Sequence, residues 1–283
     1  MTPQTDAHQH FWRLARGDYG WLTPALGPIY RDFAPEHLAP LLADAGIVRT
    51  VLVQAAPSEA ETTFLLGLAR EWPAAAGVVG WLEFAAPDAP RRIAALAREP
   101  ALLGLRPMIQ DIADADWMLS PPVRRALEAL SGTRLAFDAL VKPGHLPNLL
   151  RLLERLPALR VVIDHGAKPD IAHWRPGDGD FRAWAAHLRR AAALGAWCKL
   201  SGLVTEAGPG WSVETLRPYV AALLESFGPA RLMWGSDWPV VNLAGGYGPW
   251  RAAACALLAD LPADEQARVL GGSAAEFYRL RPA

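Results

Sequence analysis

The stretch 146–166, LPNLLRLLERLPALRVVIDHG, carries the pattern that decides the fold. Its first half repeats leucine at offsets of three and four between 149 and 156, which gives one apolar stripe along a helix. Its second half contains the run VVI at 161–163, which is continuously apolar, as expected for a parallel strand that is buried on both faces. The stretch therefore predicts a helix that covers a sheet and leads directly into one of its strands.

The same alternation of short β-rich runs and segments of helical period continues outward in both directions. Strands are predicted over eight runs: 4–12, 50–56, 77–84, 102–109, 134–141, 160–166, 196–203 and 231–238. Helices are predicted between them, among others over 34–45, 59–72, 146–156, 182–194 and 213–227. Eight strands that alternate with helices are typical of an α/β protein with a closed (β/α)8 TIM barrel. We expect a single domain over 1–283, with extra C-terminal helix over 261–281 packed outside the barrel.

An open, doubly wound sheet is the structural alternative, and its usual sign is a glycine-rich phosphate turn directly after the first strand. This chain continues from its first predicted strand with FWRLARGDYGWL at 11–22 instead. The pattern therefore favours the barrel.

The bulk composition excludes several classes of protein. The chain has 283 residues, 52% hydrophobic and 20% charged, without an uncharged run long enough for a membrane span. Its net charge of -1 provides no basic surface for nucleic acid or anionic lipid, so we expect neither partner. The N-terminal residues show no secretory leader, and Cys198 and Cys255 lack the spacing of a metal or redox motif. We expect a cytoplasmic protein with two buried free thiols.

The segment Asp6-Ala7-His8-Gln9-His10 lies on the first predicted strand. Because side chains alternate along a strand, His8 and His10 project on the same side. Near the C-terminal end of a barrel strand, that side faces the active-site interior. The other interpretation of the H-x-H pattern is a pair of hydrogen-bonded core or surface histidines.

Two other predicted strands end in polar residues. Asp237 ends the eighth strand, which closure of a barrel brings beside the first, although an isolated aspartate at such a place is often only a helix N-cap. The sixth strand ends in the run VIDHGAKP at 162–169. Either Asp164 or His165 can face the centre there, because a shift of one residue reverses the side on which each projects.

Taken together, five segments resemble the amidohydrolase superfamily. They are DAHQHFW at 6–12, VIDHGAKP at 162–169, KLSGL at 199–203, MWGSDWP at 233–239 and LGGSAAEFYRL at 270–280. More narrowly, they resemble the branch of sugar-acid lactonases of the L-fuconolactonase and L-rhamnonolactonase type, with pyrone-dicarboxylate and sulfomuconolactone hydrolases as relatives. The resemblance spans nearly the whole chain.

The resemblance implies a hydrolase that opens a small-molecule sugar lactone, an L-fucono-, L-rhamnono- or similar aldonolactone, to the aldonic acid by attack of water at the ring carbonyl. It implies that His8, His10, His165 and Asp237 are the catalytic residues. Asp237 would be the general base, and His165 would protonate the leaving oxygen. The oxyanion would be stabilised by a metal on His8 and His10, or by His165 together with Arg106.

The need for a metal stays open at this point. Many members of the superfamily hold a divalent ion with the H-x-H pair, a later histidine or modified lysine, and the final aspartate. The fourth and fifth predicted strands of this chain, over 102–109 and 134–141, contain neither histidine nor lysine. One alternative is a divalent metal, zinc or manganese, on His8, His10 and Asp237. The other is a metal-independent site in which histidines and nearby cations polarise the carbonyl directly.

Polar and aromatic residues near the strand ends are candidates for contact with a polyhydroxylated ring. The candidates are Trp12, Trp81, Glu83, Arg106, Asp138, Lys142, Lys168 and Lys199. Each also has a structural interpretation: Arg106 and Lys199 as ion-paired supports of the barrel, and Trp12 as packing under a loop.

Three other functions are compatible with the same residues. A metal-dependent decarboxylase or hydratase of an aromatic or unsaturated carboxylic acid would use the same H-x-H pair and Asp237. A phosphate-binding barrel enzyme would use the stretch LAGG at 243–246. A non-catalytic protein that binds a sugar acid would keep the pocket without needing Asp237. The spacing of residues decides neither which lactone is opened nor the oligomeric state.

Overall fold

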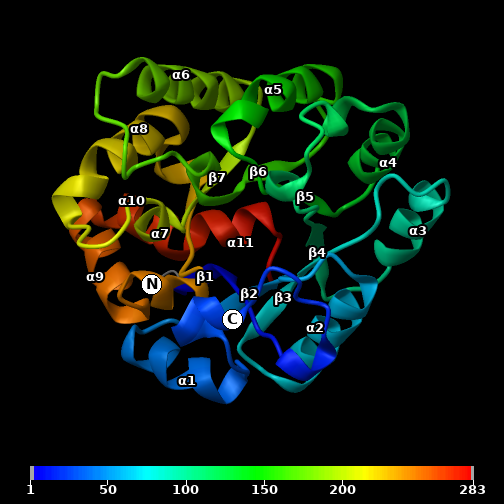
Figure 1. The fold of residues 1–283 in the computed structure, drawn as a ribbon, viewed down its shortest axis with the longest axis horizontal. Coiled ribbons are helices and arrows are strands. Elements are labelled where there is room, and N and C mark those ends of the chain that lie inside the picture. Colours follow the sequence, from blue (N-terminus) through cyan, green and yellow to red (C-terminus); the bar gives the residue numbers. More distant parts are fainter. Residues whose placement is uncertain (1–2, 282–283) are drawn as a thin grey trace.

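The computed structural model describes residues 3–281, so the outer ends of the predicted domain, residues 1–2 and 282–283, lie outside the described residues. Eight parallel strands form one sheet in the order β1 to β8, and helices surround the ring of strands (Figure 1). The prediction of a (β/α)8 barrel is confirmed. That the chain is a single domain over 1–283 stays a prediction.

The strands and helices alternate along the chain. The strands are β1 (Thr5–Gln9), β2 (Arg49–Val53), β3 (Ala75–Gly80), β4 (Leu102–Leu105), β5 (Ala136–Ala139), β6 (Val161–Ile163), β7 (Trp197–Leu200) and β8 (Leu232–Trp234). The helices are α1 (Pro35–Asp44), α2 (Glu59–Glu71), α3 (Ala89–Leu96), α4 (Pro121–Ser131), α5 (Leu146–Arg155), α6 (Gly179–Ala193), α7 (Leu203–Glu206), α8 (Val213–Arg231), α9 (Tyr247–Leu257), α10 (Ala263–Ala267) and α11 (Ser273–Phe277).

The strands β1 and β8 meet at the C-terminal end of the barrel, as barrel closure predicts. The His10 amide donates to the Trp238 carbonyl at 2.7 Å, and the Asp237 amide donates to the His8 carbonyl at 2.8 Å. A Cβ atom on Gly235 would lie 2.7 Å from the Cβ atom of His8, so only glycine allows this close approach. The end of β8 therefore lies directly beside the H-x-H segment.

Several strands end earlier than the sequence predicts. The predicted sixth strand continues to 166, whereas β6 ends at Ile163; the predicted eighth continues to 238, whereas β8 ends at Trp234. His165 has a φ of 54° and Asp237 a φ of 58°, and a strand requires negative φ. The residues that follow β6 and β8 therefore form turns at the barrel mouth.

The predicted helices are present with small shifts at their ends. α6 begins at Gly179 rather than at 182, and α8 continues to Arg231 rather than ending at 227. The extension of α8 contains Gly228, whose φ of 63° interrupts the regular helix. Boundaries of this kind depend on local backbone conformation, which apolar periodicity does not report.

The C-terminal segment closes the N-terminal end of the barrel. Phe277 and Tyr278 are almost fully buried in one cluster with the inward-facing side chains of the strands, such as Val51, Val79 and Met233. Figure 1 shows α11, in red, over the centre of the strand ring. The predicted C-terminal helices are therefore present, but α11 covers the N-terminal end of the barrel instead of packing around its outside. The open end of a barrel exposes apolar interior, and two aromatic side chains cover it.

The two cysteines differ in their surroundings. Cys198 on β7 is buried, as predicted, whereas Cys255 on α9 is exposed, so the prediction of a second buried thiol was wrong. An apolar segment of helix still has one face turned to solvent, and position 255 lies on that face. In residues 3–281, no helix has the length and apolar character needed to cross a membrane.

Candidate active site

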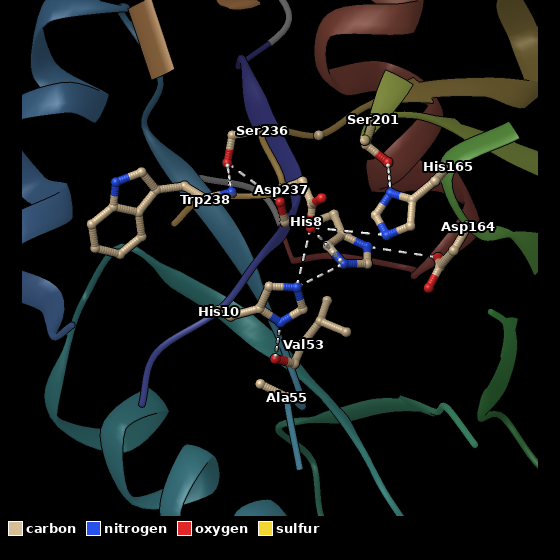
Figure 2. A network of polar contacts seen from close by, with 12 residues as sticks. His8, His10, Val53, Ala55, Asp164, His165, Ser201, Ser236, Asp237 and Trp238 are labelled. Carbon is tan, nitrogen blue, oxygen red and sulfur yellow. Dashed lines mark hydrogen bonds and ion pairs between the residues drawn. The ribbon is translucent and has the colours of Figure 1, made fainter. Parts of the chain in front are cut away.

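Four side chains converge at the C-terminal end of the barrel (Figure 2). His8 and His10 come from β1 and the residue that follows it, His165 from the turn after β6, and Asp237 from the turn after β8. Each is at most 5% exposed. The Asp237 Oδ1 atom lies 3.3 Å from His10 Nε2, 3.7 Å from His8 Nε2 and 3.8 Å from His165 Nε2. One carboxylate oxygen thus faces three imidazoles.

The hydrogen bonds of His8 and His10 fix the nitrogens that face the centre. His10 Nδ1 donates to the Val53 carbonyl at 2.8 Å, so its Nε2 presents a lone pair when the ring is neutral. His8 Nδ1 lies 3.1 Å from the Lys199 ammonium, which donates to it, so the proton of a neutral His8 is on Nε2. His8 Nε2 lies 3.2 Å from His10 Nε2 and donates to it. The lone pair of His10 also faces the Asp237 carboxylate, an arrangement that a shared proton or a cation would stabilise.

Burial and charge set the protonation states of the centre. Burial alone would raise the pKa of Asp237, but the attraction of the neighbouring histidines, His165 above all, outweighs it and holds that pKa below its ordinary value. Burial lowers the pKa of His165 to about 4. Near neutral pH the site therefore holds an ionised carboxylate beside a neutral His165.

A second, fully buried ion network supports His8 from within the barrel. The Lys199 Nζ atom donates to Asp138 Oδ2 at 2.6 Å and to His8 Nδ1 at 3.1 Å, and it forms an ion pair with Asp164 Oδ1 at 3.0 Å. Tyr278 donates from its hydroxyl to Asp138 Oδ2 at 2.6 Å. Burial raises the pKa of Asp138, whereas the charges of Lys199 and His8 overcome burial and hold the pKa of Asp164 well below its ordinary value.

The structure resolves which residue after β6 faces the centre. Asp164 contacts Lys199 and the Arg106 guanidinium, at 3.3 Å from Nη1, while His165 contacts Asp237. Both side chains face inward because the positive φ of His165 breaks the alternation of a strand. From the sequence, only one of these two side chains was expected to face the centre, so an inward orientation of both was not predicted.

Three of the eight predicted substrate contacts have no exposed surface. Trp12, Asp138 and Lys199 are 0% exposed. Trp12 donates from its indole to the Arg31 carbonyl at 2.7 Å, which is packing under a loop. Lys199 and Asp138 pair with each other inside the barrel. These contacts fit the structural interpretation of all three residues, and their contact with a substrate stays a prediction.

Arg106 is the predicted contact that the structure brings to the centre. It is 3% exposed, its Nη1 atom lies 3.5 Å from His8 Nε2, and its Nη2 atom donates to the Gln54 carbonyl. It also pairs with Asp164, so it serves as an ion-paired support at the same time. Its guanidinium can still stabilise negative charge that develops beside His8.

The other four predicted contacts have no described hydrogen bond or ion pair with the central residues. Trp81 and Lys168 are partly exposed, and Glu83 and Lys142 are exposed. Lys168 Nζ lies 3.5 Å from Glu206, and Glu83 accepts the Ala85 amide. Their contact with a substrate stays a prediction.

Sequence reasoning missed several residues that hold the site. Ser201, directly after β7, bonds His165 Nδ1 at 2.8 Å, and the Gln54 side chain, directly after β2, donates to the Arg106 carbonyl at 2.7 Å. Both are polar residues at the end of an apolar strand, the same signal that found Asp237. No sequence pattern indicated the role of Tyr278. This residue comes from the opposite end of the barrel and contacts Asp138, which pairs with Lys199.

This geometry agrees with the comparisons to known proteins. The family model described as amidohydrolase matches residues 5–280. The chain belongs to the amidohydrolase family. It is 48% identical to an L-fucono-1,5-lactonase of Burkholderia ambifaria, over 99% of this chain and 97% of that protein. It is 38% identical to an L-fucono-1,5-lactonase of Burkholderia multivorans, over 97% and 95% of the two chains.

A solved structure shows the same architecture. A Burkholderia multivorans amidohydrolase with bound zinc is 36% identical to this amidohydrolase and superposes with a TM-score of 0.92, covering 99% of this chain and 100% of the other. The zinc ion was observed in the Burkholderia multivorans structure.

The donor atoms of this amidohydrolase fit a divalent metal. Ligand bonds of about 2.0–2.1 Å place the donors of a tetrahedral zinc site about 3.4 Å apart. The Nε2 atoms of His8 and His10 and the Oδ1 atom of Asp237 lie 3.2, 3.3 and 3.7 Å apart, and His165 with His8 and Asp237 forms a second possible triad. The lone pair of His10 already faces the centre, whereas a neutral His8 would bind through Nε2 only as the other tautomer, with its proton on Nδ1, which lies 3.6 Å from Asp164 Oδ1.

Proposed function

We propose that this amidohydrolase opens a sugar-acid lactone, an L-fucono-, L-rhamnono- or similar aldonolactone, to the aldonic acid. The observation that carries the proposal is the buried Asp237 carboxylate, whose Oδ1 atom lies within 3.8 Å of three imidazoles at the barrel mouth. The similarity to two L-fucono-1,5-lactonases over nearly the full chain supports the same chemistry. We further infer that the protein acts in the cytoplasm on this small molecule, without a nucleic acid or membrane partner.

The proposed reaction begins with Asp237 as the general base. Its carboxylate takes a proton from water while the water oxygen attacks the ring carbonyl carbon. The carbonyl oxygen gains negative charge, which the Arg106 guanidinium and the Nε2–H group of His8 stabilise. A low pKa of Asp237 keeps the base ionised, although it also makes the carboxylate a weaker proton acceptor.

Collapse of the tetrahedral intermediate breaks the bond between the carbonyl carbon and the ring oxygen. The leaving alkoxide receives a proton from His165 Nε2, which carries one when Ser201 donates to Nδ1. The proton on Asp237 then passes through solvent to the imidazole. The aldonic acid ionises as it leaves, which releases one proton to solvent. Water supplies the only atoms added, so the reaction balances as a hydrolysis.

We also propose that one divalent metal, zinc or manganese, is held by His8, His10 and Asp237, with His165 as a further candidate ligand. When bound, such a metal polarises a carbonyl oxygen and lowers the pKa of a coordinated water. The distances among the donor atoms of His8, His10 and Asp237 and the zinc in the Burkholderia multivorans amidohydrolase support this proposal. The grouping of His165 with His8 and Asp237 supports His165 as the further ligand. The metal-independent alternative relies on Arg106 and the histidines alone.

The test is proton release from a panel of sugar 1,4- and 1,5-lactones, measured on purified protein of known metal content before and after chelation. Opening that stops on chelation and returns with zinc or manganese would support the metal. Opening at full rate by metal-free protein would establish the metal-independent alternative. Failure to open any lactone would contradict the proposed function, and release of carbon dioxide from an aromatic acid would favour the decarboxylase.

A further inference from the structure

Asp6 opens the DAHQH motif and has no part in the proposed reaction. Its side chain is 0% exposed and makes three hydrogen bonds. Oδ1 accepts the backbone amides of His8, at 3.1 Å, and Ser236, at 2.9 Å, and Oδ2 accepts the Tyr247 hydroxyl at 3.2 Å. One carboxylate therefore connects the strand that carries the histidines with the turn that carries Asp237.

The turn after β8 needs such an anchor. Asp237 has a φ of 58°, in the left-handed region that residues other than glycine avoid. A residue persists in this region only when surrounding contacts hold it there. The amide bound by Asp6 belongs to Ser236, the residue directly before Asp237. Loss of this hydrogen bond would therefore remove a contact that holds the backbone of Asp237 at positive φ.

Close packing transmits any movement of the turn to the site. The Asp237 amide donates to the His8 carbonyl, and the Trp238 amide donates to Ser236 Oγ at 3.0 Å. Gly235 lies so close to His8 that not even a methyl group would fit between them. Rotation at Ser236 therefore moves the Asp237 carboxylate relative to the imidazole of His8.

We propose that Asp6 is a positioning residue for Asp237, which sets the distance between that carboxylate and the histidines by holding the Ser236 amide against β1. The inference rests on the proposed function, because it assumes that Asp237 activates the water. Asp6 lies behind the backbone of the turn and acts through Ser236 without touching the reacting atoms.

The experiment compares four variants with the wild-type protein on the fastest-opened lactone. Asp6→Ala removes both amide contacts, and we expect kcat to fall about 100-fold, the effect of a misplacement of about 1 Å, with KM changed less than about threefold. Asp6→Asn keeps an oxygen for both amides, and the Tyr247 hydroxyl can reverse its role to accept from the new amide, so we expect kcat within about fivefold of wild type. Tyr247→Phe removes only the outer hydrogen bond and should change kcat less than Asp6→Ala does.

Leu188→Ala is the matched control for lost stability. Leu188 is a fully buried leucine on α6, away from the site, so its truncation lowers the thermal midpoint without a contact to the turn. With rates normalised to the folded fraction, we expect Leu188→Ala to keep the wild-type kcat. Should Asp6→Ala fail to fold, Asp6→Ser replaces it, since the shorter side chain loses the Ser236 amide.

The outcomes separate the inference from the function. If folded Asp6→Ala or Asp6→Ser has the wild-type kcat, or if Asp6→Asn loses as much kcat as Asp6→Ala, Asp6 is not a positioning residue. A selective loss of kcat that Asp6→Asn restores supports the inference. If the wild-type protein opens no lactone, the proposed function falls first, and with it the basis of this inference.

Discussion

The two ends of the barrel differ in how they are held together. At the N-terminal end, Phe277 and Tyr278 cover an apolar interior and leave little surface exposed. At the C-terminal end, buried histidines and carboxylates meet, and non-glycine residues such as His165 and Asp237 adopt positive φ. Buried polar groups and strained backbone destabilise a fold unless surrounding contacts hold them. The difference indicates that the N-terminal end contributes stability, whereas the C-terminal end contains destabilising features that the proposed reaction requires.

The two ends are connected through the interior of the barrel. Tyr278, from the C-terminal segment, donates to Asp138, which pairs with Lys199, and Lys199 donates to His8. The residue that closes one end therefore also supports a histidine at the other. The comparison can be tested by changing one end at a time.

The largest effect is expected for Asp237→Asn at the mouth. Loss of the general base should lower kcat/KM by about 1,000-fold, because an amide cannot accept the proton of the attacking water. The thermal midpoint should move by only a few degrees, since the side chain keeps its shape. Proton release and thermal unfolding measure the two quantities, and near-normal turnover by a folded variant would remove Asp237 from the mechanism.

Phe277→Ala at the N-terminal end should show the opposite profile. Truncation of a buried phenylalanine costs about 3–5 kcal/mol of the free energy of unfolding. The folded fraction should keep its kcat within about twofold, because the bottom of such a barrel contributes stability rather than catalysis. Denaturant unfolding and turnover below the unfolding transition check this. A large loss of kcat in folded protein would show that the two ends are not separable.

The smallest effect concerns the first turn of α2, where the carboxyl of Glu61 is buried. Glu61 accepts the Tyr19 hydroxyl at 2.7 Å and the Ala55 amide at 3.0 Å, yet burial raises its pKa to about 7. A carboxyl whose pKa is higher in the folded state binds more protons there, so its contribution to stability is lost as the pH rises from about 4.5 to 7.

Glu61→Gln should remove this dependence on pH. Between pH 4.5 and 8, the free energy of unfolding of the wild-type protein should fall by on the order of 3 kcal/mol more than that of the variant. Urea unfolding at several pH values measures the difference. The other titratable groups are common to both proteins, so parallel stability curves would contradict the raised pKa of Glu61.

Much of the fold could be predicted because apolar periodicity reports which face of an element is buried. The stripe of leucines in α5 and the run VVI of β6 are examples, and eight such units lead to the barrel. Barrel closure then implied that Asp237 lies beside His8, which the structure confirms. The ends of the strands were less predictable, because a positive φ at His165 leaves no trace in hydropathy.

Within the candidate site, residue type alone did not report which partners a side chain has. Lys199 has the charge expected of a substrate contact, and it lies inside the barrel, where it donates to Asp138 and His8 and pairs with Asp164. Asp6 lies in the same DAHQH motif as His8, but its hydrogen bond with the Ser236 amide joins it to the turn after β8, which is far away in the sequence.

By itself, the sequence determined the alternation of strands and helices and the side of β1 on which both histidines lie, because the periods of strands and helices are local properties of the chain. Only the tertiary structure decided that Asp164 and His165 both face the centre, that Tyr278 closes the opposite end, and that Lys199 supports His8. These outcomes depend on contacts between residues far apart in the chain and on single backbone torsions, which no local pattern of residue types encodes.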